Sequence, residues 1–570
     1  MQVESPKHAL PSRLLVLVGA FAGAGLLFYV GRELWFFGDE WTFLLHRSLS
    51  SFADLFRPHN EHWSTVPVVI YRIVFSEASL TSYTPYFLVL VSLNLAIGYA
   101  VGTHLLKLGA PVLVAALIAG GLVSFGPGGE NLLWSFQIGY AISVLAAVLS
   151  FLQIERHTPT SDIRATVLLI VSLASSGIGV PAVGVVALYF LLCRQWRRFL
   201  LVAGPPMGVY SLWLGLAGSA AVESASTNLV ETLLLLPAYT ARGLTATIDA
   251  LFGLRIGLGL LAPLVLGLAV AAFLGNRPKK SVAVVALSMM MAVLVFAGAG
   301  LTRAVALGIE QAAASRYVHV GAVFVVLGTG SAFFSSQTWT RYRSEAASLA
   351  LALAVTAIVV SNVGLLQDFG RNRVALSNDV QASVTAMAAV LLSDRDGDYL
   401  DDASPVALNP DINVGTLRRG LLDGTVRLPP GSVSSVPAFQ VERMRSLMKL
   451  RIVAAGPGVL DAEVISQVTN DATLLGLNGG CVSMDTTGPD PYVVLDIEHP
   501  GWMTVELSGE GVLEVSPVME GGSLASVSLQ EVVSASEKRW IEIADGIESV
   551  RVDLPSGSDA VVCSAVTKAG

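Results

Sequence analysis

The sequence predicts an α-helical polytopic membrane domain followed by a mainly β C-terminal module. The chain has 570 residues, of which 53% are hydrophobic and only 14% are charged, whereas soluble domains carry roughly 25% charged residues. Apolar runs fill residues 14–366, and the remainder is polar and acidic. From about residue 440 onward, apolar residues recur at every second position between Gly and Pro turns, a pattern that is typical of β-strands.

A helix needs about 20 apolar residues to cross a membrane. The runs of this kind are 14–30, 83–106, 111–126, 138–154, 199–219, 256–275, 281–301, 317–334 and 346–366. Residues 165–192 are also apolar but are interrupted at 175–181, so they form either one kinked helix or two short ones. The basic clusters near 107, 156, 194–198, 277–280 and 341–343 share the side of the N-terminus only if 165–192 crosses twice. Because cytoplasmic loops are rich in Lys and Arg, we expect about eleven helices, a cytoplasmic N-terminus and an extracytoplasmic C-terminal domain.

The first extracytoplasmic loop carries an unusual concentration of polar side chains among aromatic residues. An acidic pair, Asp39 and Glu40, follows the first apolar run, and a second cluster lies later in the same loop: His59, Asn60, Glu61, His62 and Trp63. Carboxylates and imidazoles are costly to desolvate at a membrane surface, which favours a functional site. The alternative is a loop at the membrane surface whose charges face water.

Two further segments fall on the same side of the membrane. Residues 126–137 mix a carboxylate, amides and aromatic rings in Glu130, Asn131, Trp134 and Gln137. Rings stack on sugar faces, and amides and carboxylates bind hydroxyl groups, so this set suits a sugar; the alternative is a turn with an interfacial Trp. Arg316 and Tyr317 stand at the outer end of an apolar run, where Arg can hold a phosphate with two hydrogen bonds or act as a plain interfacial anchor.

Together these features resemble the GT-C superfamily of membrane glycosyltransferases. The resemblance rests on Gly38-Asp39-Glu40 after the first helix, the long loop ending in 67–75, the interruption at 176–181 and the late Ser315-Arg316-Tyr317. It covers about residues 14–366. The cluster from His59 to Trp63 does not match a general motif of the superfamily, which is consistent with a subfamily that has its own acceptor.

The resemblance implies an enzyme that moves a sugar from a polyprenyl-phosphate donor to a cell-envelope glycan or glycolipid. Asp39 would be the general base with Glu40 as helper or alternative, and Arg316 with Tyr317 would bind the donor phosphate. A single displacement would invert the anomeric centre. Acceptor or sugar binding would fall to His59, Asn60, Glu61, His62, Trp63, Glu130, Asn131, Trp134 and Gln137. We expect no required cofactor; a divalent metal held by Asp39, Glu61 and a histidine is the alternative.

Beyond residue 366 we expect an extracytoplasmic connector over 367–436 and a β-sandwich over 437–570. The connector should contain helices at 381–392 and 417–423. Between them, Asp394, Asp396 and Asp398 resemble a calcium loop, although Asp-rich turns are also common on protein surfaces. The sandwich is predicted to resemble a jelly roll or carbohydrate-binding module; it either binds glycan, with Trp502 and Trp540 as stacking residues, or caps the membrane domain. Cys481 and Cys563 lie in this module, where a disulfide between them is expected.

Several functional classes are disfavoured by the sequence. The net charge of -8 gives no nucleic-acid signal, and no Gly-rich phosphate loop supports ATP-driven transport. We therefore expect a multi-pass glycosyltransferase of the bacterial plasma membrane, with membrane lipid and the lipid-linked donor as partners. The alternatives are a transporter or lipid flippase, or a non-catalytic scaffold for envelope assembly.

Overall fold

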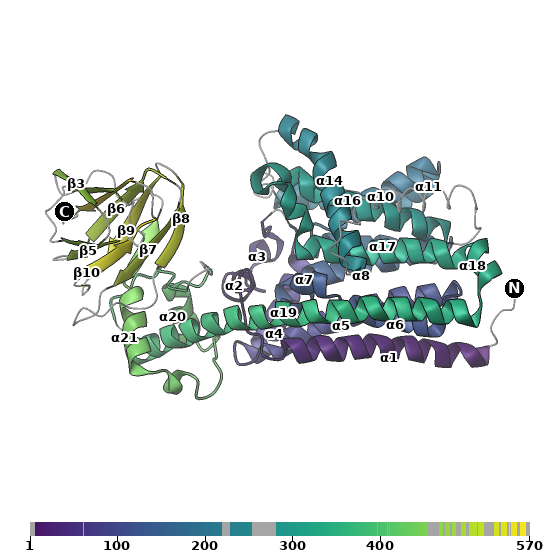
Figure 1. Cartoon of the computed structure of the whole chain (residues 1–570), viewed down its shortest axis with the longest axis horizontal. Helices are drawn as coiled ribbons and strands as arrows, with labels where there is room; N and C mark the ends of the chain where they lie inside the picture. Colours follow the sequence, from purple (N-terminus) through teal and green to yellow (C-terminus); the bar gives the residue numbers. More distant parts are fainter. Residues whose placement is uncertain are drawn as a thin grey trace. The chain divides into compact units, whose positions relative to one another are not determined.

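A computed structural model of the chain describes residues 6–60, 62–218, 229–252, 281–395 and 397–453 except 407, 408 and 410, and beyond them mainly strand residues between 467 and 565 (Figure 1). The chain forms two compact units. The helical unit comprises Met1–Leu34, Arg47–Val74 and Tyr83–Ala375. The mixed unit comprises Trp35–His46, Phe75–Ser82 and Leu376–Gly570. The acidic pair of the first loop therefore belongs to the mixed unit, while most of the predicted membrane domain forms the helical unit.

Long apolar helices build the helical unit. They are α1 (Pro6–Gly31), α5 (Thr84–Lys107), α6 (Val112–Val123), α8 (Ile138–Ile154), α9 (Pro159–Leu173), α10 (Gly179–Leu192), α12 (Gly204–Leu216), α14 (Leu229–Phe252), α16 (Val282–Leu307), α17 (Ser315–Ser335) and the first part of α19 (Glu345–Ser393). Short helices join them: α3 (Phe52–Phe56), α7 (Gly129–Leu133), α11 (Trp196–Arg198), α18 (Gln337–Tyr342), η1 (Gly126–Gly128), η2 (Ser135–Gln137), η3 (Phe199–Ala203) and η5 (Ile309–Ala313). Helix α4 (Thr65–Ala78) begins in this unit and ends in the mixed one.

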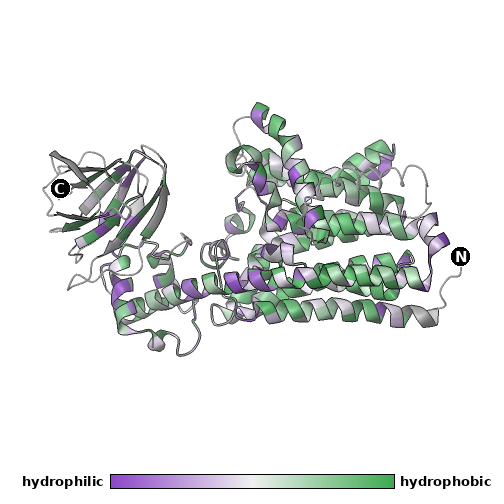
Figure 2. Ribbon diagram, in the orientation of Figure 1, coloured by the Kyte–Doolittle hydropathy of each residue, from purple (hydrophilic) through white to green (hydrophobic). Residues whose placement is uncertain are grey.

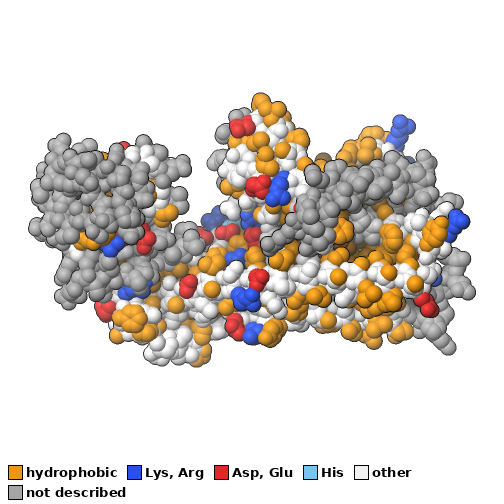
Figure 3. Space-filling view, viewed as in Figure 1, with side chains coloured by type: hydrophobic (Ala, Val, Ile, Leu, Met, Phe, Trp, Pro, Cys, Tyr) orange, Lys and Arg blue, Asp and Glu red, His pale blue; other side chains and the backbone are white. Residues whose placement is uncertain are grey.

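Eight helices in the described part of the chain are long and apolar enough to cross a membrane. They are Leu10–Gly31, Thr84–Lys107, Val112–Leu133, Ser135–Ile154, Trp196–Leu216, Val282–Leu307, Ser315–Ser335 and Glu345–Ser393. Hydrophobic residues dominate these helices (Figure 2), and hydrophobic side chains are spread along the bundle on the face shown in Figure 3. The predicted polytopic helical domain is thus confirmed. The expected span at 256–275 lies outside the described residues, so the count of about eleven and the membrane orientation stay predictions.

The interrupted stretch 165–192 forms two helices, α9 and α10, joined by a turn. The Ser175 carbonyl in this turn approaches Gly139 at the start of α8 so closely that a Cβ on Gly139 would lie 2.5 Å from it. The turn of this hairpin therefore lies at the end of the bundle at which α8 begins. Polar and glycine residues break the helix here because Gly and Pro interrupt a helix that the flanking apolar residues would otherwise continue.

Helices α1 and α6 pack through small residues. A Cβ added to Gly19 would lie 2.3 Å from the Ala116 carbonyl oxygen, and one added to Gly23 would lie 2.4 Å from that of Gly120. These residues are spaced four apart on both helices, the spacing that lets two membrane helices approach closely. This contact fixes α1, and hence the start of the first loop, against the rest of the bundle.

Helix α19 runs without interruption from Glu345 to Ser393, so the domain boundary expected at 366 and the separate helix expected at 381–392 both fall inside it. The hydrophobic residues of its first part give way to a hydrophilic stretch in its middle (Figure 2), after which hydrophobic and hydrophilic residues are mixed. Loss of hydrophobicity marks where an apolar span can end, but it does not end a helix unless Gly, Pro or a cap does so. The predicted division of the chain into three parts at residues 366 and 436 stays a prediction, and the two compact units described above have other boundaries.

Two antiparallel sheets make up most of the mixed unit. Their orders are β1-β9-β6-β11-β4-β3 and β2-β5-β10-β7-β8. The strands are β1 (Leu450–Val453), β2 (Gln467–Asn470), β3 (Thr473–Asn478), β4 (Cys481–Asp485), β5 (Tyr492–Asp496), β6 (Gly501–Leu507), β7 (Gly511–Pro517), β8 (Leu529–Val533), β9 (Lys538–Ile543), β10 (Ser549–Asp553) and β11 (Asp559–Ala565). Alternate residues of both sheets, such as Val493 and Val505, share one buried core. The predicted β-sandwich is therefore confirmed.

The mixed unit also contains the helices α2 (Glu40–Leu45), α20 (Val414–Leu422) and α21 (Ala438–Leu447), the short η6 (Val433–Ser435), and the last parts of α4 and α19. Helix α20 matches the helix expected at 417–423 within a few residues. Cys563 on β11 is disulfide-bonded, and its register partner across the sheet is Cys481 on β4. The side chain of Cys481 lies outside the described residues, so the pairing of these two thiols stays a prediction.

Candidate functional site

The second predicted loop folds directly onto the first turn of α17. The Ser315 hydroxyl donates to the Pro127 carbonyl at 2.8 Å and accepts from the Glu130 amide at 3.1 Å. Asn131 Nδ2 donates to the Arg316 carbonyl at 2.8 Å. Gly128 lies against the buried His319 ring, where a Cβ would come within 2.7 Å. Two segments that are far apart in the sequence thus form one polar surface at this end of the bundle.

Arg316 and Glu130 form an ion pair on this surface. Arg316 Nη1 lies 3.0 Å from Glu130 Oε1, and the two side chains are 25% and 16% exposed. Arg316 Nε is buried and has no hydrogen-bond partner among the residues that the structure describes. A guanidinium carries five N–H donors, so much of its capacity to bind an anion remains after a single bond to Glu130.

A second arginine reaches the same place from α16. The guanidinium carbons of Arg303 and Arg316 lie 5.6 and 5.5 Å from the centre of the Tyr317 ring, and Arg303 donates a hydrogen bond to the Tyr317 hydroxyl. Tyr317 is itself 3% exposed. The two guanidinium groups place positive charge beside this buried ring, which favours a bound anion.

Tyr239 of α14 adds a buried hydroxyl that sequence reasoning missed. Its side chain is fully buried, and its Oη has no hydrogen-bond partner in the described part of the chain. Burial raises the pKa of Tyr239, and the nearby Tyr317 raises it further, while the charges of Arg303 and Arg316 oppose the rise. The hydroxyl therefore stays protonated near neutral pH and lies within electrostatic reach of the two arginines.

The histidine cluster of the first loop forms a tight turn beside this surface. The backbone groups of His59 and His62 exchange two hydrogen bonds of 3.0 Å, and Asn60 between them has a left-handed φ of 48°. Asn adopts that conformation more readily than most residues. The predicted site residue Glu61 lies outside the described residues.

Each histidine of this turn meets an aromatic residue of the second loop or of α8. The His59 ring lies edge-on to Phe136 at 5.2 Å, and the His62 ring lies edge-on to Tyr140 at 6.3 Å. His62 also packs so closely on Gly177 that a Cβ there would lie 2.5 Å from its Nδ1. The hairpin turn after α9 and the two predicted loops therefore converge at one end of the bundle.

Trp63 and Trp134 are both packed against other side chains. Trp63 stacks on Trp213 with ring centres 5.4 Å apart and an angle of 9° between the planes, and its Nε1 donates to Thr65. Trp134 is buried, and the guanidinium of Arg373 lies 5.0 Å from its ring centre. A cation over an indole ring stabilises both groups. Arg373, which the sequence did not single out, is thus a third cation of this end of the bundle.

The amides beside Trp134 are almost completely buried. Asn131 and Gln137 are 2% and 1% exposed, and their side-chain carbonyl oxygens have no hydrogen-bond partner among the described residues. Unsatisfied buried acceptors of this kind are rare and are typical of sites that bind a ligand or water. Both residues were predicted to bind sugar, and that role stays a prediction.

The acidic pair lies in the mixed unit. Glu40 is fully buried, and its Oε2 accepts from the Phe37 amide at 2.8 Å. Asp39 precedes α2 and is only half-buried. Burial and its contact with the backbone give Glu40 the role of holding the turn, whereas Asp39 is the more accessible carboxylate. That Asp39 shares a site with Arg316 stays a prediction.

The predicted calcium loop carries a different set of contacts. Asp394 Oδ2 lies 2.7 Å from both the Tyr399 hydroxyl and Arg445 Nη1. The hydrogen bond from Tyr399 lowers the pKa of Asp394, and burial raises the pKa of Tyr399 to about 12. Asp396 lies outside the described residues, and within the described part no three His, Cys, Asp or Glu residues are grouped to hold a metal. Calcium binding by Asp394, Asp396 and Asp398 stays a prediction.

The predicted stacking residues of the sandwich lie side by side. The rings of Trp502 and Trp540 meet edge to face at 6.3 Å, and the Lys538 ammonium lies 5.0 Å from the Trp540 ring centre. Both indoles are half-buried. Because side chains alternate along a strand, they lie on the face of the sheet opposite the buried Met503 and Ile541.

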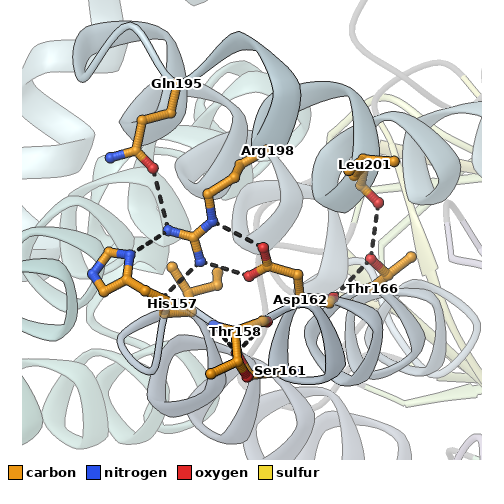
Figure 4. A network of polar contacts seen from close by, with 9 residues as sticks. His157, Thr158, Ser161, Asp162, Thr166, Gln195, Arg198 and Leu201 are labelled. Carbon is orange, nitrogen blue, oxygen red and sulfur yellow. Dashed lines mark hydrogen bonds and ion pairs between the residues drawn. The ribbon is translucent and has the colours of Figure 1, made fainter.

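The other end of the helical unit holds a contrasting polar network (Figure 4). Arg198 binds both carboxylate oxygens of Asp162, with Nε–Oδ2 at 3.0 Å and Nη2–Oδ1 at 2.6 Å. Its remaining donors reach His157 Nδ1, Gln195 Oε1 and the Ile154 carbonyl. This arginine is saturated with protein partners, which is the arrangement expected of a structural clamp.

No protein-family model and no curated protein sequence matches this chain. Its structure is similar to that of ArnT from Cupriavidus metallidurans, solved as a crystal structure bound to undecaprenyl phosphate, with 10% identity and a TM-score of 0.44 over 73% of this chain and 89% of that one. It is also similar to the cryo-EM structure of the arabinosyltransferase EmbB from Mycobacterium smegmatis, with 11% identity and a TM-score of 0.34 over 100% of this chain and 66% of that one.

Proposed function

We propose that this chain is a membrane glycosyltransferase of the bacterial cell envelope. It takes a sugar from a polyprenyl-phosphate donor and transfers it to an extracytoplasmic glycan or glycolipid. The resemblance of the sequence to the GT-C superfamily is the basis for proposing a polyprenyl-phosphate donor and a location in the plasma membrane. The residues of the helical unit and of its loops support the roles in phosphate and sugar binding that we propose for them.

The arrangement around Tyr317 is the observation that carries the proposal. Arg303 and Arg316 flank one buried ring, and Arg316 is ion-paired with Glu130 while its buried Nε has no hydrogen-bond partner among the described residues. Burying a charge at the edge of a membrane costs free energy, so a buried guanidinium with an unused donor, as at Arg316 Nε, is expected where an anion binds. The phosphate of a lipid-linked sugar brings that anion, and its polyprenyl chain would lie among the apolar helices.

The proposed reaction is one displacement at the anomeric carbon. The Asp39 carboxylate takes the proton of an acceptor hydroxyl as its oxygen forms a bond to the anomeric carbon. The bond from that carbon to the phosphate oxygen breaks at the same time, and the polyprenyl phosphate leaves with the electron pair. Arg316, with Tyr317 and Arg303, stabilises the negative charge that develops on the leaving phosphate. Attack opposite the leaving group inverts the configuration.

Sugar and acceptor binding is assigned to the residues that converge at the same end of the helical unit. His59 and His62 lie beside aromatic rings, and Asn131 and Gln137 keep buried acceptor oxygens available for hydroxyl donors. Glu130 has a second role, since its carboxylate holds Arg316 until the donor phosphate arrives. No metal is required by this scheme.

Linkage analysis of the envelope glycans of a deletion strain tests the proposal. The strain is complemented with the wild-type gene, with Asp39→Asn or with the control Asp54→Asn in the same loop, at equal protein levels in the membrane. We expect one linkage to disappear on deletion and to return with wild type and Asp54→Asn but not with Asp39→Asn. Return of the linkage with Asp39→Asn would remove Asp39 from the site, and an unchanged linkage profile on deletion would favour a transporter or scaffold.

A further inference from the structure

The turn that carries Asp39 is built by residues from two distant parts of the sequence. Residues Trp35–His46 and Leu376–Gly570 belong to the same compact unit. The Gly38 amide donates to Asn409 Oδ1 at 2.7 Å, across 371 positions of sequence. The Trp35 amide donates to the buried Ser377 hydroxyl at 3.2 Å. The C-terminal region thus contacts the backbone on which the proposed base is mounted.

From these contacts we infer that Asn409 is a positioning residue for Asp39. This inference rests on the proposed function, because it assigns Asn409 a role in the orientation of the general base. Asn409 does not touch the reacting atoms in this scheme. It acts through Gly38, the residue immediately before Asp39.

Gly38 has a conformation that needs an external tether. Its φ is +61°, a left-handed value that glycine adopts without the strain imposed by a Cβ. The same freedom lets a glycine leave that conformation easily unless a hydrogen bond holds it. The bond to Asn409 fixes the peptide plane on the N-terminal side of Gly38, and the following residue is then directed by the start of α2.

The neighbouring amide is fixed in a second way. The Phe37 amide donates to the buried Glu40 carboxylate, so two successive N–H groups have side-chain acceptors. The rings of Trp35, Phe36 and Trp41 pack around the turn at centre distances between 5.3 and 5.9 Å. These contacts restrain the turn, and Asp39 in it is half-buried.

Asn409 is itself held in place by its own loop. Asn409 is 1% exposed. Its backbone N–H donates to the Val406 carbonyl, and its backbone carbonyl accepts from the Ile412 N–H and the Ser404 hydroxyl. Two residues farther on, Asp411 Oδ2 accepts from the Thr42 hydroxyl at 2.6 Å, and the Asp411 carbonyl lies 2.7 Å from His46 Nε2. The loop therefore contacts the residues around α2 at two places: Asn409 binds Gly38 before the helix, and Asp411 binds Thr42 within it and His46 at its end.

The hydrogen bond between Gly38 and Asn409 matters for catalysis because it holds the backbone next to Asp39. A general base must stand within hydrogen-bond distance of the hydroxyl that it deprotonates, and a displacement of about 1 Å lowers the rate by roughly 100-fold. Loss of the Asn409 acceptor would let the peptide before Gly38 rotate. The Asp39 carboxylate would then sample orientations away from the acceptor while donor binding, which does not involve this turn, stays the same.

Three substitutions in the full-length protein test the inference. Asn409→Ala removes the acceptor, Asn409→Asp keeps an acceptor oxygen of nearly the same shape, and Asn413→Ala is the control. Asn413 lies four residues away and caps α20 through the Thr416 amide, without a hydrogen bond to the Gly38 turn. Transfer is measured in membranes of the deletion strain with the labelled polyprenyl-phosphate sugar as donor, at saturating donor and over a donor titration.

We expect Asn409→Ala to lower the maximal rate about tenfold and to change the half-saturating donor concentration by less than twofold. Asn409→Asp should restore most of the rate, and Asn413→Ala should keep it within twofold. A maximal rate for Asn409→Ala within twofold of wild type would overturn the inference. An equal loss with Asn409→Asp would also overturn it, because an acceptor oxygen would then not be what matters.

Hydrogen exchange separates this inference from the proposed function. The peptide covering residues 35–45 is followed by mass spectrometry in the purified protein, which requires no transfer activity. We expect exchange near Gly38 to accelerate at least tenfold in Asn409→Ala and to stay slow in Asn409→Asp and Asn413→Ala. Unchanged exchange in Asn409→Ala would contradict the tether, whereas full activity of Asp39→Asn would contradict the proposed base and leave the exchange result standing.

Discussion

The two ends of the helical unit each hold an arginine paired with a carboxylate, and the two pairs differ in how completely the arginine is bound. Arg198 binds both oxygens of Asp162 and uses its other donors on His157, Gln195 and the Ile154 carbonyl. Arg316 has one close contact to Glu130, and its buried Nε has no partner among the described residues. The two pairs are similarly shielded, since all four side chains are between 16% and 25% exposed.

Burial alone therefore does not explain the difference between the two pairs. A buried arginine is stable when its donors are satisfied, as at Arg198, and incomplete satisfaction lowers stability unless a ligand completes the set. The Arg316 end also collects Arg303, Tyr239 and the convergent loops, whereas the Arg198 end joins neighbouring segments of one short region (Figure 4). We therefore interpret Arg198 as a structural residue and Arg316 as part of a binding site, and substitutions at the two pairs can test this difference.

Arg316→Ala should have the largest effect on function. Removing a cation that faces the leaving phosphate is expected to lower transfer about 100-fold, or close to 3 kcal/mol of transition-state stabilisation. The thermal unfolding temperature of the purified protein should fall less than in Arg198→Ala, because Arg316 makes one bond to Glu130 whereas Arg198 uses all of its donors on protein partners. Transfer is measured in membranes with labelled donor and normalised to the amount of folded protein. Transfer within threefold of wild type would end the distinction between the two arginines.

Arg198→Ala should show the opposite pattern. It leaves Asp162 without its partner and the His157 and Gln195 acceptors without a donor, which should destabilise the helical unit by about 3 kcal/mol. The protein that remains folded should transfer sugar at nearly the wild-type rate. Thermal unfolding in detergent and the same membrane assay give the two values. A selective loss of transfer without loss of stability would place Arg198 in the site instead.

Glu130→Gln should sharpen the comparison through binding. The neutral amide no longer competes with an anion for Arg316, so polyprenyl phosphate without a sugar should bind about fivefold more tightly, or close to 1 kcal/mol. Asp162→Asn is the matched change at the other end and should leave this affinity unchanged. Titration of the purified proteins with polyprenyl phosphate measures both. Weaker binding by Glu130→Gln would show that Glu130 supports the ligand rather than competes with it.

The exposed pair of Arg242 and Glu310 should show the smallest effect. The hydrogen bond from Arg242 and its charge lower the pKa of Glu310. A lowered pKa in the folded state means that the pair stabilises the protein above the ordinary carboxyl pKa and loses this effect as pH falls below about 4. Glu310 is 80% exposed, so Glu310→Gln should shift the unfolding temperature by less than about one degree at pH 7, and by less still as acid protonates Glu310. A shift in unfolding temperature as large as that of Arg198→Ala would contradict the view that an ion pair stabilises this protein more when it is buried and when all donors of its arginine are bound.

The sequence predicted those parts of the fold that local patterns determine. Apolar length located the spans that the structure describes, and the break at residues 175–181 predicted the hairpin between α9 and α10. Alternation with period two located β5, β6, β7 and β10. The continuation of α19 beyond residue 366 was missed, because charged residues such as Asp368 and Arg371 end an apolar run without ending a helix.

The candidate site was only partly visible in the sequence for a related reason. Loop residues such as Glu130 and Arg316 could be recognised as unusual types at unusual places, and the structure brings these two together. Tyr239 stands within a largely apolar helix, and Asn409 lies far along the chain in a polar loop, so no local pattern distinguishes them. Their importance depends on contacts between distant segments, which periodicity and composition do not report.

The central claim is tested most directly by transfer of labelled sugar in membranes of a deletion strain. The membranes carry wild type, Asp39→Asn or the loop control Asp54→Asn in equal amounts, and receive the polyprenyl-phosphate sugar that restores the missing linkage. The account predicts transfer to endogenous envelope acceptor with wild type and Asp54→Asn, and a loss of at least about 100-fold with Asp39→Asn. Transfer by Asp39→Asn at the wild-type rate would contradict the assignment of the base, and no transfer by wild type above the deletion background would contradict the proposed glycosyltransferase itself.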